Sequence, residues 1–170
     1  MQTNQINPSI EMQRERINNV ELSQTDKENY FKSILTDKPY EETVDLFDGK
    51  MRATFRVMTV RENSDIVNQI ELDRKAEKTS DNDSYMITIA AYRLCLSITS
   101  VDNQAFSTIT KENYKPSDES DSYVAARAKA THNWATAKLS LFLDAFQKFE
   151  AKVIRLTNEV QTSNFWTASA

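Results

Sequence analysis

The side chains that could do chemistry in this chain are few, and their counts exclude several kinds of active site. The 170 residues include one glycine, one histidine and one cysteine. Glycine-rich phosphate loops need several glycines, the His-Glu-x-x-His zinc motif needs two histidines, and Cys-x-x-Cys ligands need paired cysteines. A serine triad would depend on His132 alone, without the Gly-x-Ser-x-Gly turn that presents a serine. We therefore expect no catalytic residue, no cofactor and no bound metal. An enzyme that uses carboxylates remains an alternative.

Two acidic clusters could bind a cation or simply cap helices. Acidic residues stand at Asp81 and Asp83, and again at Asp118, Glu119 and Asp121. The spacing of a calcium loop fails after Asp83, because no glycine follows at the required position. Short acidic and polar clusters of this kind are typical of helix N-termini, so we favour capping for both.

A basic segment, ARAKATHNWATAK, surrounds His132 and Trp134. It could contact an anion or a nucleic acid, or form a solvated helix face with a half-buried tryptophan. The net charge of −4 and the pI near 5.1 argue against nucleic acid as the partner. Cys95 lies in an apolar run, where an inert core residue is expected. No apolar run approaches the roughly 18 residues of a membrane span, and the N-terminus lacks a secretory signal. We therefore expect no membrane association.

One hairpin stands between the helical patterns. In LFDGKMRATFRVMT, Asp48-Gly49 is the dipeptide that a type I′ turn favours, because both central residues need positive φ. The return strand alternates: apolar residues face one side, whereas Arg52 and Arg56 face the other. We predict a hairpin over about 42–58, with the two arginines able to pair with acidic groups of a neighbouring subunit or to remain solvated.

Helical periodicity covers most of the remaining chain. A thin helix follows Ser9, and a second follows Ser23 and places Tyr30, Phe31, Ile34 and Leu35 on one face. Thr59-Val-Arg-Glu is a capping box that opens a helix reaching about Lys78. The nearly apolar segment 84–98 predicts a buried central helix, with a strand at 86–89 as the alternative. A small turn or second hairpin is expected at 100–106, and a loop at 107–121.

The last part of the chain predicts one long helix, or two in line, capped by Ser120 or Asp121. Apolar residues repeat there with heptad spacing, which is typical of a helix-packing seam. The seam residues are Leu139, Phe142, Phe146, Phe149, Val153, Leu156 and Val160. They could pack on the chain's own core or on a partner. Near the terminus, Phe165 and Trp166 could anchor a partner.

Together these patterns predict an α+β fold, predominantly α. The hairpin would pack on a small helical bundle with a long C-terminal helix. We expect an N-terminal arm over 1–25, one globular domain over 26–166 and a short tail over 167–170.

The order of these elements resembles the small tail-assembly and baseplate-hub proteins of tailed bacteriophages. The resemblance spans roughly residues 30–166. It rests on D-L-F-D-G-K-x-R-x-T-F-R-x-M-T, Y-R-L-x-L-S-I, F-x-K-F-E-x-K-V and the final N-F-W. It implies a non-catalytic protein that acts through protein–protein contacts during tail or baseplate assembly. It supplies no catalytic residue.

The function expected from the sequence is therefore that of a phage tail or baseplate component. Its partners would be other tail or baseplate proteins or a second copy of the chain, in the host cytoplasm during assembly or in the virion. The expected interface residues are Phe142, Phe146, Phe149, Val153, Leu156, Phe165, Trp166, Arg52 and Arg56. The alternative is a small phage regulatory or inhibitory protein that binds a host factor.

Overall fold

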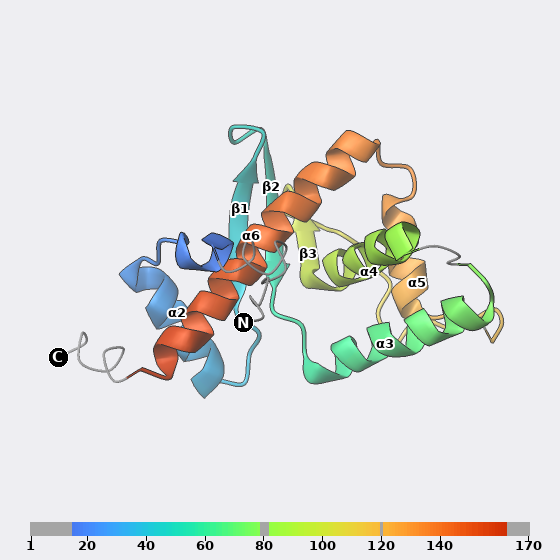
Figure 1. Ribbon diagram of the computed structural model, residues 1–170, viewed down its shortest axis with the longest axis horizontal. Helices are drawn as coiled ribbons and strands as arrows, with labels where there is room; N and C mark the ends of the chain where they lie inside the picture. Colours follow the sequence, from blue (N-terminus) through green and yellow to red (C-terminus); the bar gives the residue numbers. More distant parts are fainter. Residues whose placement is uncertain (1–14, 79–81, 120, 163–170) are drawn as a thin grey trace, which may run out of the picture. The chain divides into compact units, whose positions relative to one another are not determined.

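The computed structural model describes residues 15–78, 82–119 and 121–162, and it is mixed α+β and mostly helical, at 56% helix. The chain divides into two compact units. One comprises the described residues of 1–40 and 147–170, and the other is 41–146. Helix α6 (Thr136–Val160) contributes its beginning to the second unit and its end to the first (Figure 1). This division differs from the arm and single domain expected from the sequence.

Unit 41–146 contains a four-stranded antiparallel sheet. Its strands follow the order β1 (Glu41–Leu46), β2 (Met51–Arg56), β3 (Ile98–Val101) and β4 (Gln104–Ala105). The expected hairpin is therefore confirmed as β1 and β2, and the second hairpin as β3 and β4. Ala53 and Phe55 are fully buried while Arg52 is exposed, so the predicted alternation of β2 is correct. The sequence did not reveal that the two hairpins join into one sheet.

Both hairpins reverse through residues with positive φ. Asp48 and Gly49 have φ of 56° and 80°, and the Lys50 amide donates to the Phe47 carbonyl at 3.2 Å. These features fit the predicted type I′ turn. Phe47 itself also has a positive φ of 53°, which is uncommon for a bulky residue.

Three helices surround the core of this unit: α3 (Val60–Lys75), α4 (Asn82–Ser97) and α5 (Tyr123–Ala128). The capping box of Thr59 and Glu62 at the start of α3 is confirmed. Segment 84–98 is helical rather than extended up to Ser97, but the expectation that it is buried throughout is wrong. Its last turns are buried, whereas Met86 and Ile87 are exposed. The core cluster contains Ile66, Tyr92, Cys95, Leu96, Tyr123, Val124 and Ala128.

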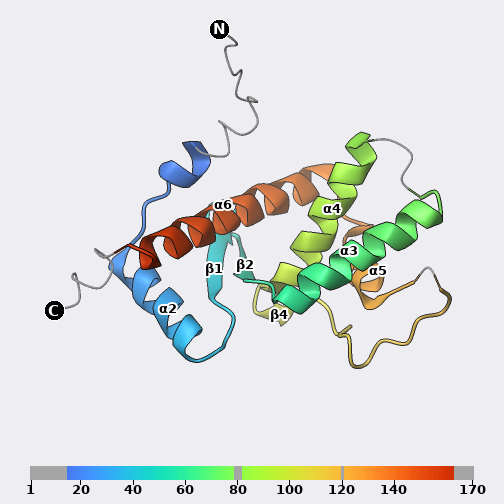
Figure 2. The same cartoon turned by 60° about the horizontal axis from the view of Figure 1, so that its bottom comes forward.

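The C-terminal region contains a break that the sequence did not predict. Ser122, not Ser120 or Asp121, caps α5, which continues into a short 3₁₀ turn (Lys129–Thr131). The chain then changes direction before α6 begins, so α5 and α6 are not in line (Figure 1). Before α5, a long irregular segment connects it to β4 (Figure 2). The loop expected at 107–121 is therefore confirmed for its described residues.

The other unit packs α2 (Gln24–Leu35) on the end of α6. The Tyr30 hydroxyl and the Thr157 hydroxyl lie 2.6 Å apart, and Lys152 pairs with Asp26 at 2.8 Å. Ser23 caps α2 as expected. The apolar face predicted for α2 is only partly correct, since Tyr30 and Phe31 are half-buried but Ile34 and Leu35 are exposed. Residues 9–14 of the helix expected after Ser9 lie outside the described residues, and residues 15–18 are helical.

Replacing Gly49 by valine should destabilise the hairpin without a steric clash. A Cβ built on Gly49 would meet no atom within 4 Å, so the cost is the positive φ alone. We expect Gly49→Val to lower the free energy of unfolding by about 1 to 2 kcal/mol. Gly49→Asn should cost clearly less, because asparagine tolerates this geometry. Chemical denaturation measures both, and equal stability of Gly49→Val and the parent protein would contradict the turn assignment.

Candidate functional site

Of the seven seam residues of α6, which the sequence offered as an interface or as core, four are buried and three are half-buried. Phe142 and Leu156 are fully buried, and Phe146 and Phe149 nearly so. Val153 is half-buried. A partner would need these side chains to be accessible. The structure therefore favours the core interpretation over the interface interpretation.

Aromatic contacts within each unit account for this burial. In unit 41–146, the ring centroids of Phe142 and Trp134 are 4.6 Å apart, and those of Phe146 and Phe55 are 5.9 Å apart. In the other unit, Phe149 stacks on Tyr40 at 6.1 Å with an interplanar angle of 2°. The large aromatic residues of the heptad pattern thus fill irregular spaces in the chain's own core.

The two hairpin arginines expected at an interface already have partners. Arg52 Nε lies 3.0 Å from Asp45 Oδ1, in a pair that solvent reaches on both sides. Arg56 donates to both oxygens of Glu62, with Nη1 to Oε2 at 2.9 Å. Arg56 is therefore committed within the unit rather than available to a neighbour. Phe165 and Trp166 lie outside the described residues.

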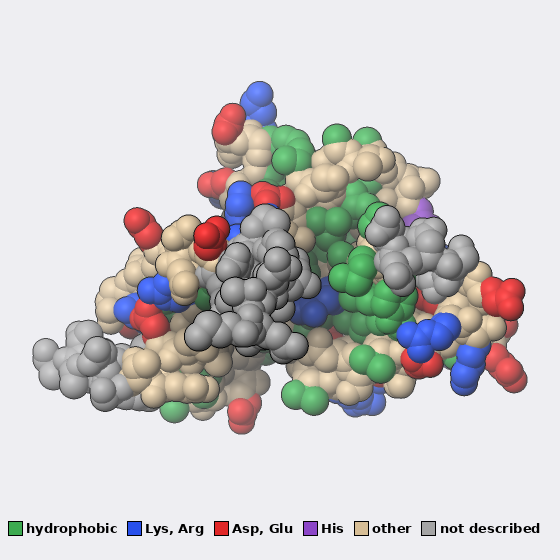
Figure 3. All heavy atoms as spheres, in the orientation of Figure 1, with side chains coloured by type: hydrophobic (Ala, Val, Ile, Leu, Met, Phe, Trp, Pro, Cys, Tyr) green, Lys and Arg blue, Asp and Glu red, His purple; other side chains and the backbone are tan. Residues whose placement is uncertain are grey.

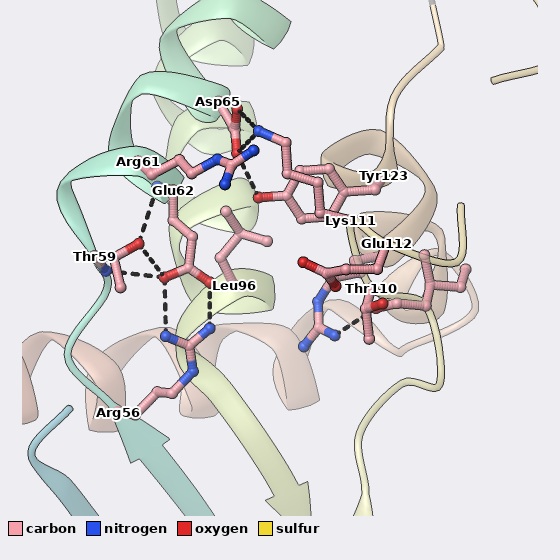
Figure 4. Close-up of a pocket in the computed structure, with 12 residues that line it drawn as sticks. Arg56, Thr59, Arg61, Glu62, Asp65, Leu96, Thr110, Lys111, Glu112 and Tyr123 are labelled. Atoms are coloured by element: carbon pink, nitrogen blue, oxygen red, sulfur yellow. Dashed lines mark hydrogen bonds and ion pairs between the residues drawn. The ribbon is translucent and has the colours of Figure 1, made fainter. Parts of the chain in front are cut away.

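A polar pocket of about 330 Å³ opens between α3, the loop after β4 and α5 (Figure 4). Basic and acidic side chains alternate around it. The lining residues are Arg56, Thr59, Arg61, Glu62, Asp65, Leu96, Ile109, Thr110, Lys111, Glu112, Tyr123 and Arg127. A concave surface lined by polar groups is the usual location of a binding or active site.

On one side of the pocket, Glu62 performs two tasks. It accepts hydrogen bonds from Arg56, and it closes the capping box by accepting from the Thr59 amide at 2.9 Å. Burial opposes the charge of Glu62, but these hydrogen bonds outweigh it and hold the pKa of the carboxyl below its ordinary value. The same pairing raises the pKa of Arg56. Both groups are therefore fixed in their charged forms.

On the other side, Asp65 joins two elements. Lys111 Nζ donates to both of its oxygens, at 2.5 and 2.7 Å, and the Tyr123 hydroxyl donates to Oδ2 at 2.9 Å (Figure 4). Burial, with the adjacent Asp65, raises the pKa of Tyr123, so the phenol stays protonated. These bonds attach the loop and α5 to α3.

The pocket chemistry is that of a structural charge network. Of the acids that line the pocket, Glu62 and Glu112 have a pKa below the ordinary value, which suits an ion-pair partner rather than a general acid. The nearby thiol of Cys95 is buried, and burial raises its pKa to about 11. A thiol in that state is not a nucleophile at neutral pH.

The acidic cluster at Asp121 and the basic segment around His132 are the remaining candidates from the sequence. Asp121 accepts from the hydroxyls of Tyr114 and Ser117, the latter at 2.9 Å. Among the described residues, no group of three or more His, Cys, Asp or Glu could hold a metal ion. His132 is exposed and Trp134 is half-buried between Phe106 and Phe142, as the solvated-face interpretation expects, but Arg127 of the same segment donates to the Cys95 carbonyl and is not solvated.

An apolar face on α4 is the surface that sequence reasoning missed. Met86 is 64% exposed and Ile87 is 59% exposed. Figure 3 shows hydrophobic side chains gathered over α4. The signal was present, because a helix that is apolar on all sides has more apolar surface than one small core can cover.

Comparisons with protein-family models, with curated proteins and with solved structures gave no match. Within the described part of the chain, no helix combines the length and apolar character needed to cross a bilayer.

Truncating a seam residue should unfold the protein rather than only release a partner. Phe142 is fully buried against Trp134, so we expect Phe142→Ala to lower the free energy of unfolding by about 3 to 5 kcal/mol. The neighbouring Leu141 is 45% exposed, and Leu141→Ala should cost less than about 1 kcal/mol. Thermal and urea unfolding measure both. A stable Phe142→Ala protein that loses a binding partner would restore the interface interpretation.

The Arg56–Glu62 pair should contribute to stability in a pH-dependent way. Glu62→Gln keeps an oxygen for the helix cap but removes the charge, so we expect a loss of about 1 to 2 kcal/mol at neutral pH. Since the pKa of Glu62 is lowered by folding, its contribution is full above the unfolded-state pKa. It is lost as the pH falls through the folded-state pKa.

The stabilities of Glu62→Gln and the parent protein should therefore converge in acid. Glu71→Gln is the control, because the Arg74–Glu71 pair at 2.7 Å is exposed on both sides and should contribute little. Equal effects of the two substitutions at neutral pH would show that the pocket pair has no special role.

Proposed function

We propose that this chain is a non-enzymatic structural or assembly protein that acts through protein–protein contacts, as a component of a bacteriophage tail or baseplate. The resemblance in element order and motifs suggests the phage setting. The tail or baseplate proteins beside it would be its partners, in the host cytoplasm during assembly or in the virion.

The observation that carries the proposal is the apolar face of α4. Met86 and Ile87 lie one after the other on a helix whose last turns are buried in the core, and each leaves more than half of its side chain in water. Burying such a pair on a partner removes apolar surface from water, which favours association. The same rigid helix positions the face, because Tyr92 anchors it to α3 through Asp73 at 2.5 Å.

The state of the polar pocket also supports a binding role over catalysis. Its most enclosed acids, Glu62 and Asp65, are occupied by Arg56, Lys111 and Tyr123. A ligand that used these groups would have to break ion pairs that hold α3, the loop and α5 together. Catalysis generally needs an acid or base with a pKa adjusted toward the working pH, and the shifts here run the other way.

Replacing Met86 and Ile87 by glutamine should abolish or weaken association while leaving the fold intact. Glutamine is a good helix former, so we expect the free energy of unfolding to change by less than about 1 kcal/mol. Leu35→Gln is the matched control, since Leu35 is 68% exposed on α2. Co-sedimentation with tail or baseplate particles of the encoding phage measures the effect. Unchanged co-sedimentation of the double variant would exclude the α4 face.

The alternative function, a regulator that binds a host factor, predicts a different distribution of the protein. A component retained in the particle is present in purified virions at a fixed copy number per tail. A regulator is absent from both virions and assembly intermediates. Quantitative mass spectrometry of purified virions and of tail intermediates therefore separates the two functions, and absence from both samples would overturn the phage-component proposal.

A further inference from the structure

The outer edge of strand β1 carries a second feature that the proposed function does not use. The sheet order places β1 at one end, with β2 as its only neighbour among the described strands. A strand in this position has a row of backbone groups that point away from the sheet. Such an edge can accept an extended segment of another protein, which adds to the sheet as a further strand.

Hydrogen bonds on β2 show which β1 residues direct their backbone N–H and C=O groups away from the sheet. The Arg52 amide donates to Asp102 Oδ1 and the Arg52 carbonyl accepts from the Asp102 amide, each at 2.8 Å, so Arg52 faces the β3 side. The Thr54 carbonyl likewise accepts from the Thr99 hydroxyl. The backbone N–H and C=O groups of neighbouring residues in a strand point toward opposite edges. Those of Ala53 are therefore directed toward β1, where Ala53 pairs with Val44.

The alternation on β1 follows directly. Val44 directs its backbone groups toward β2, and so do the residues two positions away on either side. Glu41, Thr43 and Asp45 therefore direct their backbone N–H and C=O groups toward the outer edge. All three are exposed residues, and β2 is the one described strand beside β1.

The charge of β1 indicates what kind of segment fits. The strand reads EETVDL, with three acidic residues among six and no basic residue. Arg52 partly offsets Asp45 through their exposed pair, and Arg56, the cross-strand neighbour of Glu41, already pairs with Glu62. The edge is thus acidic on balance. Opposite charges on adjacent strands stabilise their pairing, and like charges directly opposite destabilise it.

A second copy of β1 does not meet this condition. If two copies paired antiparallel about Thr43, Glu41 of each would lie opposite Asp45 of the other. Acidic residues at an edge are a common means of preventing such self-pairing. They leave the edge open to a segment that supplies positive charge.

We propose that the outer edge of β1 binds an extended, lysine- or arginine-rich segment of a partner protein by adding it to the sheet as a fifth strand. The Glu41, Thr43 and Asp45 backbone groups supply the hydrogen bonds, and the acidic side chains select the basic segment. This surface is separate from the α4 face, so it stands whether or not that face binds a tail protein.

The probe is a short capped peptide that alternates lysine with threonine and valine, and the test uses the full chain. We expect the peptide to bind and to slow the exchange of the Thr43 and Asp45 amides, while the Val44 amide, already bonded to β2, changes little. A matched peptide with glutamate in place of lysine should not bind. Binding without protection of the two outward amides, equal binding of the glutamate peptide, or no binding would overturn the proposal.

Two substitutions at one position then separate backbone from side-chain effects. Thr43→Pro removes an outward N–H but none of the bonds to β2, and proline is tolerated on edge strands in this orientation. It should weaken peptide binding by about tenfold or more, which corresponds to roughly 1.4 kcal/mol. Thr43→Ala loses the same hydroxyl contact to Thr54 but keeps the N–H, and it should bind like the parent protein.

Thermal unfolding checks that both variants fold. If Thr43→Pro fails to fold, amide exchange in the parent protein remains the deciding measurement. The Met86→Gln, Ile87→Gln variant should bind the peptide normally, which distinguishes failure of this edge from failure of the α4 face. A dimer that protects the same amides without peptide would show that a second copy occupies the edge, and would overturn the proposal.

Discussion

The hydrogen bonds of the Arg127 guanidinium are the interaction on which unit 41–146 most depends. Its Nε donates to the Cys95 carbonyl at 3.0 Å, Nη2 to the Ile98 carbonyl at 3.2 Å and Nη1 to the Ile109 carbonyl at 2.8 Å. Cys95 lies in the last turn of α4, where carbonyls lack helical partners, and β3 begins directly after α4. One side chain of α5 therefore stabilises the end of a helix, the start of a strand and the loop that follows the sheet. Burial lowers the pKa of Arg127, but an arginine remains protonated, so the positive charge faces the negative end of α4.

A buried polar network adds further hydrogen bonds between α3, α4 and the start of α5. Asp73 on α3 accepts from Gln69 at 2.8 Å and from the Tyr92 hydroxyl of α4, and the Ser122 hydroxyl donates to Gln69 Oε1 at 2.5 Å. Ser122 also caps α5. Because a buried polar group is costly unless it is hydrogen-bonded, these matched donors and acceptors restrict how the three helices can pack. The interior is thereby held by specific partners as well as by apolar area.

Local signals in the sequence predicted the elements whose causes are local. Asp48-Gly49 specified the first turn, and the Thr59–Glu62 box specified the start of α3, since each acts within four residues. Residues that depend on distant neighbours were not predictable in this way. Glu62 can accept hydrogen bonds from Arg56 because the start of α3 lies close to the end of β2. The break before α6 accompanies the packing of Trp134 between Phe106 and Phe142. After the ends of α2 and α3, the residues with positive φ are Asp37 and Glu77, whereas glycine is the usual residue at this position.

The two apolar helices show why apolar patterns in the sequence do not by themselves separate core from interface. Helix α6 packs one apolar stripe on rings such as Phe55 and Tyr40, and the apolar residues outside that stripe, Leu141 and Ile154, are each 45% exposed. Regular heptad spacing is therefore satisfied as well by a core as by a partner. Helix α4 is apolar on nearly all sides, and a core can cover only one side of a surface helix. Its exposed residues Met86 and Ile87 remain when Leu94 and Leu96 are fully packed. The excess of apolar surface over what the unit can bury, rather than the regularity of the pattern, is thus the basis of the binding face proposed for this chain.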